Sequence, residues 1–322
     1  MLVLKRLLAG LLLCILVICI LFWTPDRERH ALEARYLADR ADMITLLGTD
    51  LHVRDDGPRD QHAVVMLHGL GASLHTWEPW AQALARDFRV IRFDMPGAGL
   101  SPPDSSNDYS DGRMIALLLA LMRDRQLESI DLIGHSMGGR IAWRFAADQP
   151  DRLRRLILVA PDGFASPGFE YNTPPEVPLF MEAMRYFLPE FMFAANVEAS
   201  YANPGRLTDQ TLQRYYDLVL APGNRAALLE RTRQTRLLPP APILATIMAH
   251  TLLIWGERDL MIPFSNADDY LAHLPNAGLV SYPGLGHVPH EEAPNKVLPA
   301  VVAFLKAPVA DPESASLRLQ AR

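Results

Sequence analysis

Ser136 stands in the pentapeptide Gly134-His135-Ser136-Met137-Gly138, between a run typical of a buried strand and a stretch with helical spacing. A serine on such a sharp strand-to-helix turn forms a nucleophile elbow. Glycines two residues to either side of the serine leave room where the chain reverses and presents the hydroxyl. The pattern therefore predicts that Ser136 is a nucleophile.

A serine hydroxyl needs a base, and the base needs a group that orients it. Asp259 follows the strand-like run 251–254, and His287 follows the run 279–282 in a glycine-rich loop. The carboxyl ends of parallel strands share one edge of a sheet, so the three side chains are expected to meet there. The spacing predicts acyl transfer with His287 as general base and Asp259 as its orienting acid.

The chain order Ser136, Asp259, His287 resembles that of the α/β-hydrolase superfamily. Other blocks carry the same resemblance from about residue 44 to residue 306. These blocks are His68-Gly69-Leu70-Gly71 after the strand 63–67, Asp94-Met95-Pro96-Gly97-Ala98-Gly99-Leu100-Ser101 after the strand 90–93, and Glu292 with Pro294 beyond the histidine. The resemblance implies an α/β-hydrolase fold, with a mostly parallel sheet flanked by helices and an inserted helical cap.

The resemblance also implies an oxyanion hole made by the backbone N–H groups of Leu70 and Met137. Asp162 follows the strand-like run 156–159 and is the alternative position for the acid of the triad. Three other histidines are given lesser roles. His290 is expected to be a solvated loop residue, His135 to pack or hydrogen-bond locally, and His68 to order its own loop.

Composition restricts the possible partners. The chain has 322 residues, 49% of them hydrophobic, and a formal net charge of −6. This is enough apolar material for one large core, and the charge gives no basic face for nucleic acid. No group of residues has metal-ligand spacing and no phosphate-binding glycine loop precedes a lysine, so no metal and no cofactor are expected. The oligomeric state cannot be inferred from the sequence.

The N-terminus is the other informative segment. Lys5 and Arg6 precede a nearly continuous apolar run over residues 7–23. We expect a transmembrane anchor over residues 1–24, with the N-terminus in the cytoplasm and the catalytic domain outside, in the periplasm or the extracellular space. A cleaved signal peptide is the alternative. Both cysteines, Cys14 and Cys19, lie in this segment, so the folded domain is expected to have no disulfide.

The rest of the chain divides by its patterns. Residues 25–42 are expected to form a stalk, with helical spacing over 30–40 that indicates a spacer. Alternating strand and helix patterns place the core at 43–163 and 241–307. Clustered prolines and helical stripes of Phe and Met predict a cap insertion over 164–240. Residues 308–322 read as a disordered tail.

These features together predict a membrane-anchored serine hydrolase that cleaves carboxylic esters of short to medium apolar acyl groups through an acyl-enzyme. Two alternatives remain open. The same triad could hydrolyse a C–C bond of vinylogous diketones, although the asparagine usual before the serine in those enzymes is His135 here. The second alternative is that the protein has this fold but binds a ligand without catalysing a reaction.

Overall fold

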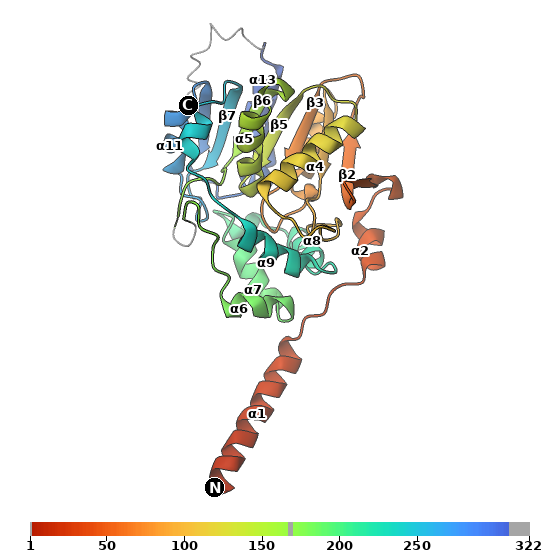
Figure 1. Cartoon of the computed structure of the whole chain (residues 1–322), viewed down its shortest axis with the longest axis vertical. Coiled ribbons are helices and arrows are strands. Elements are labelled where there is room, and N and C mark those ends of the chain that lie inside the picture. The colour runs from red at the N-terminus through yellow and green to blue at the C-terminus, as the bar shows by residue number, and fades with distance from the viewer. Residues whose placement is uncertain (1, 167–169, 309–322) are drawn as a thin grey trace.

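The computed structural model describes residues 2–166 and 170–308. An eight-stranded sheet forms its centre (Figure 1). The strands are β1 (Met43–Leu46), β2 (Thr49–Asp56), β3 (Ala63–Leu67), β4 (Arg89–Phe93), β5 (Ile130–His135), β6 (Leu153–Val159), β7 (His250–Gly256) and β8 (Ala277–Tyr282). The predicted tail, apart from its first residue, lies outside the described residues.

The strand order is β1-β2-β4-β3-β5-β6-β7-β8, with β1 and β2 antiparallel to each other and β2 antiparallel to β4. All pairings from β4 to β8 are parallel. The predicted mostly parallel sheet is therefore confirmed. Its parallel strands end at a common edge, and β5, β7 and β8 lead into the loops that carry Ser136, Asp259 and His287.

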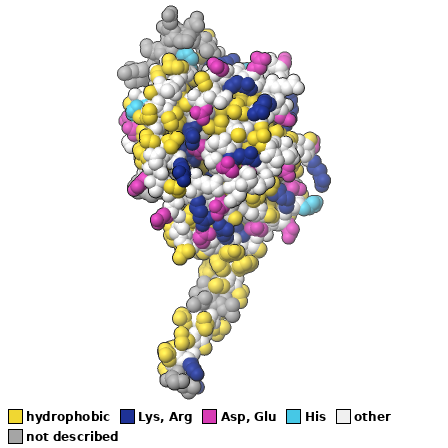
Figure 2. Space-filling view, in the orientation of Figure 1, with side chains coloured by type: hydrophobic (Ala, Val, Ile, Leu, Met, Phe, Trp, Pro, Cys, Tyr) yellow, Lys and Arg dark blue, Asp and Glu magenta, His cyan; other side chains and the backbone are white. Residues whose placement is uncertain are grey.

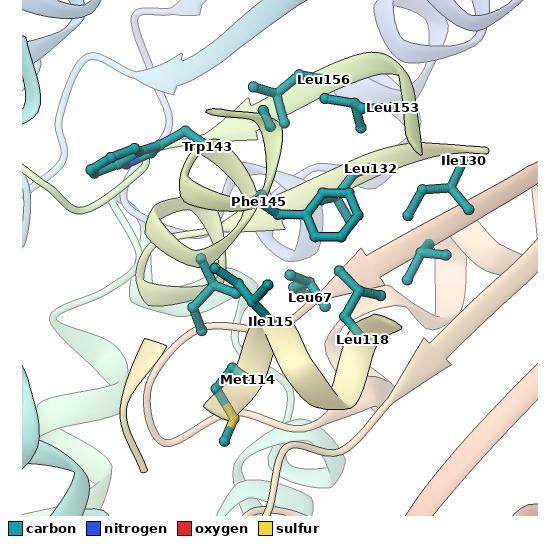
Figure 3. Packing of buried hydrophobic residues seen from close by; sticks show 14 of the residues in the cluster. Leu67, Met114, Ile115, Leu118, Ile130, Leu132, Trp143, Phe145, Leu153 and Leu156 are labelled. Atoms are coloured by element: carbon teal, nitrogen blue, oxygen red, sulfur yellow. The ribbon is translucent and has the colours of Figure 1, made fainter. Parts of the chain in front are cut away.

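Helices cover both faces of the sheet, as apolar parallel strands require. The helices of the core are α3 (Glu78–Leu84), α4 (Asp111–Asp124), α5 (Met137–Asp148), α10 (Pro240–Leu244), α11 (Asn266–His273), α12 (Pro289–Glu292) and α13 (Pro294–Lys306), with the 3₁₀ turns η1 (Arg40–Asp42), η2 (Leu74–Trp77) and η3 (Pro150–Arg152). On one face, side chains of α4 and α5 interlock with those of β3, β5 and β6 (Figure 3). On the other, α3 and α13 pack around Trp77 and Trp80, both fully buried.

The segment between β6 and α10 forms a helical layer beside the carboxyl edge of the sheet (Figure 1). It contains α6 (Leu179–Glu182), η4 (Ala183–Arg185), α7 (Glu190–Glu198), η5 (Pro204–Arg206), α8 (Asp209–Val219) and α9 (Asn224–Gln234). We call this layer the cap. It has a small apolar core of its own, in which Phe193 and Tyr216 pack with ring centroids 5.5 Å apart.

The first helix, α1 (Leu2–Phe22), projects away from the cap (Figure 1), and hydrophobic side chains lie along it (Figure 2). No helix within the described ranges is long and apolar enough to cross a membrane. The predicted transmembrane anchor, and the single-pass location with an outside catalytic domain, are therefore wrong. Lys5 and Arg6 lie inside α1, so its uncharged part from Leu7 to Phe22 is only about 24 Å long at 1.5 Å per residue, against about 30 Å of hydrocarbon.

The segment after α1 is attached to the cap. Trp23 stacks on Tyr186 with ring centroids 5.7 Å apart, and the N–H of Thr24 donates to the Tyr186 carbonyl at 2.8 Å. The following helix, α2 (Arg29–Tyr36), buries Leu32, and the Tyr36 hydroxyl donates to Asp217 of α8 at 2.8 Å. The segment interpreted as a spacer thus packs on the cap, and its helix ends at Tyr36, four residues earlier than its spacing suggested.

Candidate active site

Ser136 occupies the corner between β5 and α5, with φ 52° and ψ −120°. This is a strained backbone conformation for a residue with a side chain. The flanking glycines are required by contact: a Cβ on Gly134 would lie 2.3 Å from the Gly138 carbonyl oxygen, and one on Gly138 would lie 2.4 Å from that of Leu67. The corner can form only without these two side chains, and it leaves Ser136 lining a cavity.

His287 and Asp259 form a buried pair beside this serine. Nδ1 of His287 lies 2.8 Å from Oδ2 of Asp259, whose side chain is fully buried. The other oxygen, Oδ1, accepts hydrogen bonds from the N–H groups of Met261 at 2.8 Å and Ile262 at 2.9 Å. The carboxylate is therefore fixed by the loop after β7, and it directs Nε2 of His287 away from Asp259. His287 lines the same cavity as Ser136.

The alternative acid has different partners. The carboxylate of Asp162 pairs with Arg140 of α5, and its backbone carbonyl accepts hydrogen bonds from Trp143 and Tyr270. Its N–H donates to the Ser136 carbonyl at 3.0 Å, so Asp162 supports the elbow through the main chain. The structure thus brings Asp259, rather than Asp162, to the imidazole of His287.

The two residues expected to form the oxyanion hole belong to different loops, Met137 to the elbow and Leu70 to the turn after β3. Met137 is the first residue of α5, so its N–H is among those that a helix leaves without an intrahelical acceptor. Leu70 lies in the turn after β3, and both residues line a small cavity of about 30 Å³ next to the main one. His68 orders this turn, because its Nδ1 lies 2.8 Å from the Gly69 carbonyl and its Nε2 accepts the Met95 N–H at 2.9 Å.

Next to His287 lies a cluster of buried, mutually tilted rings. The ring centroid of His135 is 4.6 Å from that of His287 and 4.5 Å from that of His290, which lies 4.3 Å from Trp77. Nε2 of His135 donates to the His287 carbonyl at 2.9 Å, and His290 lies 3.0 Å from the Thr76 hydroxyl. The expectation of a local role for His135 agrees with this geometry.

The expectation that His290 is solvated is wrong, because its side chain is fully buried against Trp77. Burial, with a further electrostatic contribution from His287, lowers the pKa of His290 to about 3. Burial likewise holds the pKa of His135 well below its ordinary value, with further contributions from His290 and His287. Both rings therefore stay neutral at ordinary pH.

The cavity that contains Ser136 and His287 has a volume of about 870 Å³. Its wall includes apolar side chains of the cap and of the end of α1, among them Phe22, Phe180, Met184, Phe187, Leu188, Phe191, Met192, Phe193, Val197 and Leu229. No Asp, Glu, Lys or Arg side chain of the described ranges lines it. Such a cavity favours a neutral, apolar substrate, since a buried charge without a partner is costly.

No group of three or more His, Cys, Asp or Glu in the part of the chain that the structure describes could hold a metal ion. Sequence reasoning missed one contact at the site, the hydrogen bond of 2.8 Å from the His287 N–H to the carbonyl of Ser200 in the cap. A main-chain carbonyl can belong to any residue type, so no sequence pattern could have identified this contact.

A model of the alpha/beta hydrolase fold family matches residues 62–294, which is most of the chain and includes all three predicted catalytic residues. The chain belongs to this family. Membership of this family explains the fold and indicates that the protein is a hydrolase. Relatives within the family are named for the hydrolysis of different kinds of bond.

Three relatives show this range. A putative carbamate hydrolase RutD of Pseudomonas savastanoi is 28% identical over 77% of this chain and 97% of its own length. A pimeloyl-[acyl-carrier protein] methyl ester esterase of Nitrosomonas europaea is 29% identical over 72% and 91%. A 2-hydroxy-6-oxo-6-phenylhexa-2,4-dienoate hydrolase of Burkholderia cepacia is 27% identical over 74% and 84%.

Solved structures agree on the architecture. The crystal structure of a membrane phospholipase A, described as a bacterial virulence factor, superposes with a TM-score of 0.70 at 24% identity. The match covers 94% of this chain and 98% of that one. At this level of identity the likeness shows the shared fold alone.

Proposed function

We propose that the protein is a serine hydrolase that cleaves carboxylic esters of apolar acids through an acyl-enzyme. One observation carries the proposal: a buried Asp259–His287 pair shares with the strained Ser136 a large cavity, and no Asp, Glu, Lys or Arg lines it among the residues that the structure describes. The esterase among the relatives supports the choice of bond.

In this proposal Oγ of Ser136 attacks the ester carbonyl while Nε2 of His287 takes up its proton. The backbone N–H groups of Leu70 and Met137 stabilise the oxyanion, at about 3–4 kcal/mol per donor in comparable enzymes. His287 then donates the proton to the leaving alcohol, and the acyl group stays on Ser136. Water attacks this acyl-enzyme, with its proton passing to His287 and from there to Oγ as the acid leaves. Asp259 keeps the imidazole in the required tautomer throughout.

A C–C hydrolase acting on a vinylogous diketone is the second candidate, since a dienoate hydrolase is among the relatives. The substrate in that enzyme's name is a carboxylate. The main cavity has no lysine or arginine in its described wall to pair with such an anion, and His135 precedes the nucleophile. The guanidinium of Arg231 lines the small cavity beside Leu70 and Met137, where it donates to the Pro96 carbonyl at 2.7 Å. The lack of lysine and arginine in the described wall of the main cavity, together with His135, favours the ester.

The test is a series of chromogenic esters from acetyl to octanoyl, assayed beside a vinylogous diketone carboxylate. Each methylene buried in the cavity contributes about 0.8 kcal/mol, so kcat/KM should rise about fourfold per added carbon until the cavity is full. A flat series together with rapid cleavage of the diketone would replace the ester proposal by the second candidate. Binding of esters without turnover of either class would favour a non-catalytic role.

A further inference from the structure

The loop that carries His287 is covered by a loop of the cap. The His287 N–H donates to the carbonyl of Ser200, and the approach is so close that a Cβ on Gly286 would lie 2.6 Å from the same oxygen and from the N atom of Ala202. Only glycine permits this contact. The candidate base is thus held from the inserted segment as well as from the core.

Glu292 lies at the junction of these two loops, with its carboxylate fully buried. Oε2 accepts the N–H of Gly286 at 2.8 Å and that of Ala202 at 3.2 Å, and Oε1 accepts the N–H of Asn203 at 3.0 Å. The guanidinium of Arg206, itself partly exposed, lies 3.6 Å from Oε1. One side chain therefore ties the residue before the candidate base to two residues of the cap.

We propose that Glu292 is a positioning residue that fixes the cap loop and the histidine loop as one unit. It acts through Gly286, and so holds the imidazole of His287 between Asp259 and the cavity. The inference rests on the proposed role of His287 as the base. It assigns to this buried carboxylate a function in catalysis that involves no contact with substrate.

A carboxylate suits this place because it only accepts hydrogen bonds, and all three neighbouring groups are N–H donors. A glutamine of the same size would turn an NH₂ group toward at least one of them and leave that donor unpaired. The adjacent Glu291 differs, since it bonds to the side chains of Arg214, Tyr215 and Thr76. Of these two glutamates, only Glu292 therefore connects the loop of the candidate base to the main chain of the cap.

The experiment compares Glu292→Gln with Asp131→Asn. Asp131 is also a fully buried carboxylate, but it is the second residue of β5, at the opposite end of the strand from Ser136, where it pairs with Arg154. Both variants should lower Tm. We expect Glu292→Gln to reduce kcat on a preferred ester at least about thirtyfold with KM within about threefold, because a misplaced base slows the reaction more than binding. Asp131→Asn should leave both constants unchanged.

A kcat for Glu292→Gln equal to that of Asp131→Asn, with an active wild type, would overturn the inference. An inactive wild type would instead refute the proposed function. If Glu292→Gln does not fold, Glu292→Asp provides the test. The shorter side chain keeps the charge but moves it away from the three N–H groups that Glu292 binds. We then expect kcat to fall with little change in KM. A wild-type kcat for Glu292→Asp in that case contradicts the inference.

A second readout needs no substrate. The proton on Nδ1 of His287 that binds Asp259 should give a low-field NMR resonance in the wild type and in Asp131→Asn. Loss or broadening of this resonance in folded Glu292→Gln is the expected result. An unchanged resonance would show that Glu292 does not position the imidazole.

Discussion

On the core side of the cavity, Ser136, Asp259 and His287 are held by main-chain geometry and buried hydrogen bonds, whereas on the cap side the wall is mostly apolar and rich in Phe, Met and Leu side chains. Several of these are exposed, with 74% of Phe180 and 65% of Phe191 accessible. Hydrogen bonds fix direction, and apolar contacts can be rearranged at small cost. We therefore expect changes in the apolar part of the cap to alter the choice of substrate. Changes in the hydrogen-bonded loops, including the cap loop that binds His287 through Ser200, should alter the reaction rate.

The largest effect is expected at the acid. Asp259→Asn should reduce kcat about 10⁴-fold because the imidazole loses its required tautomer. Asp162→Asn is the matched control on the neighbouring strand, and it should lose only the ion pair with Arg140. Steady-state kinetics on one ester measure both. If Asp162→Asn reduces kcat more than Asp259→Asn does, then Asp162, in the loop after β6, is the acid of the triad and Asp259 is not.

The elbow offers a purely steric test. A methyl group on Gly138 would meet the backbone oxygens of Leu67 at 2.4 Å and His68 at 2.6 Å, so Gly138→Ala must displace the corner. We expect a loss of about 1–3 kcal/mol in the free energy of unfolding and about a hundredfold loss in kcat. A Cβ on Gly284 meets nothing within 4 Å, so Gly284→Ala should match the wild type. Equal behaviour of the two variants in melting and kinetics would contradict the model of the elbow.

The buried rings next to His287 predict a pH dependence of stability. His290 has a pKa of about 3 in the folded protein against an ordinary 6.5, so only the unfolded chain binds a proton between these values. The contribution of neutral His290 to the free energy of unfolding is complete above pH 6.5. It falls by about 1.4 kcal/mol per pH unit as the pH is lowered toward 3. His290→Gln should flatten the decline of the free energy of unfolding, measured with urea from pH 7 to pH 4.5. If the free energy of unfolding falls equally with pH in the variant and the wild type, His290 does not contribute to the pH dependence.

The smallest effect is expected in the cap. Phe180 lines the cavity, and its neighbour Leu179 on α6 does not, although both side chains are largely exposed. Phe180→Ala should lower kcat/KM for an octanoyl ester about fivefold, through about 1 kcal/mol of lost apolar contact, and leave the acetyl ester unaffected. Leu179→Ala should change neither. An equal loss of kcat/KM on both esters would mean that Phe180 does not contact the acyl chain but helps to hold the catalytic residues in place.

The features that could be predicted from the sequence are those that leave a local signal. The elbow demands glycines at fixed offsets from Ser136, and the parallel strands that end at Ser136, Asp259 and His287 are apolar runs followed by turns. The order of these residues then predicts the fold, and the family match agrees with it. Their close approach follows from the sheet topology.

The features that could not be predicted depend on partners far along the chain. His290 is buried because Trp77 and Thr76 reach it across more than two hundred residues, and a polar loop sequence carries no sign of this. The segment after α1 is fixed by Tyr186 of the cap. The membrane prediction is wrong because no helix in the described ranges is long and apolar enough to cross a membrane.

We propose that Ser136 is the activated nucleophile of this hydrolase. The most direct measurement is labelling of the full chain with a fluorophosphonate probe, followed by mass spectrometry of the digested protein, with Ser136→Ala as control. We expect one adduct, on Ser136, and no labelling of the folded Ser136→Ala variant, because the probe reacts only with an activated hydroxyl. An adduct on another residue, or undiminished labelling of Ser136→Ala, would show that Ser136 is not the nucleophile.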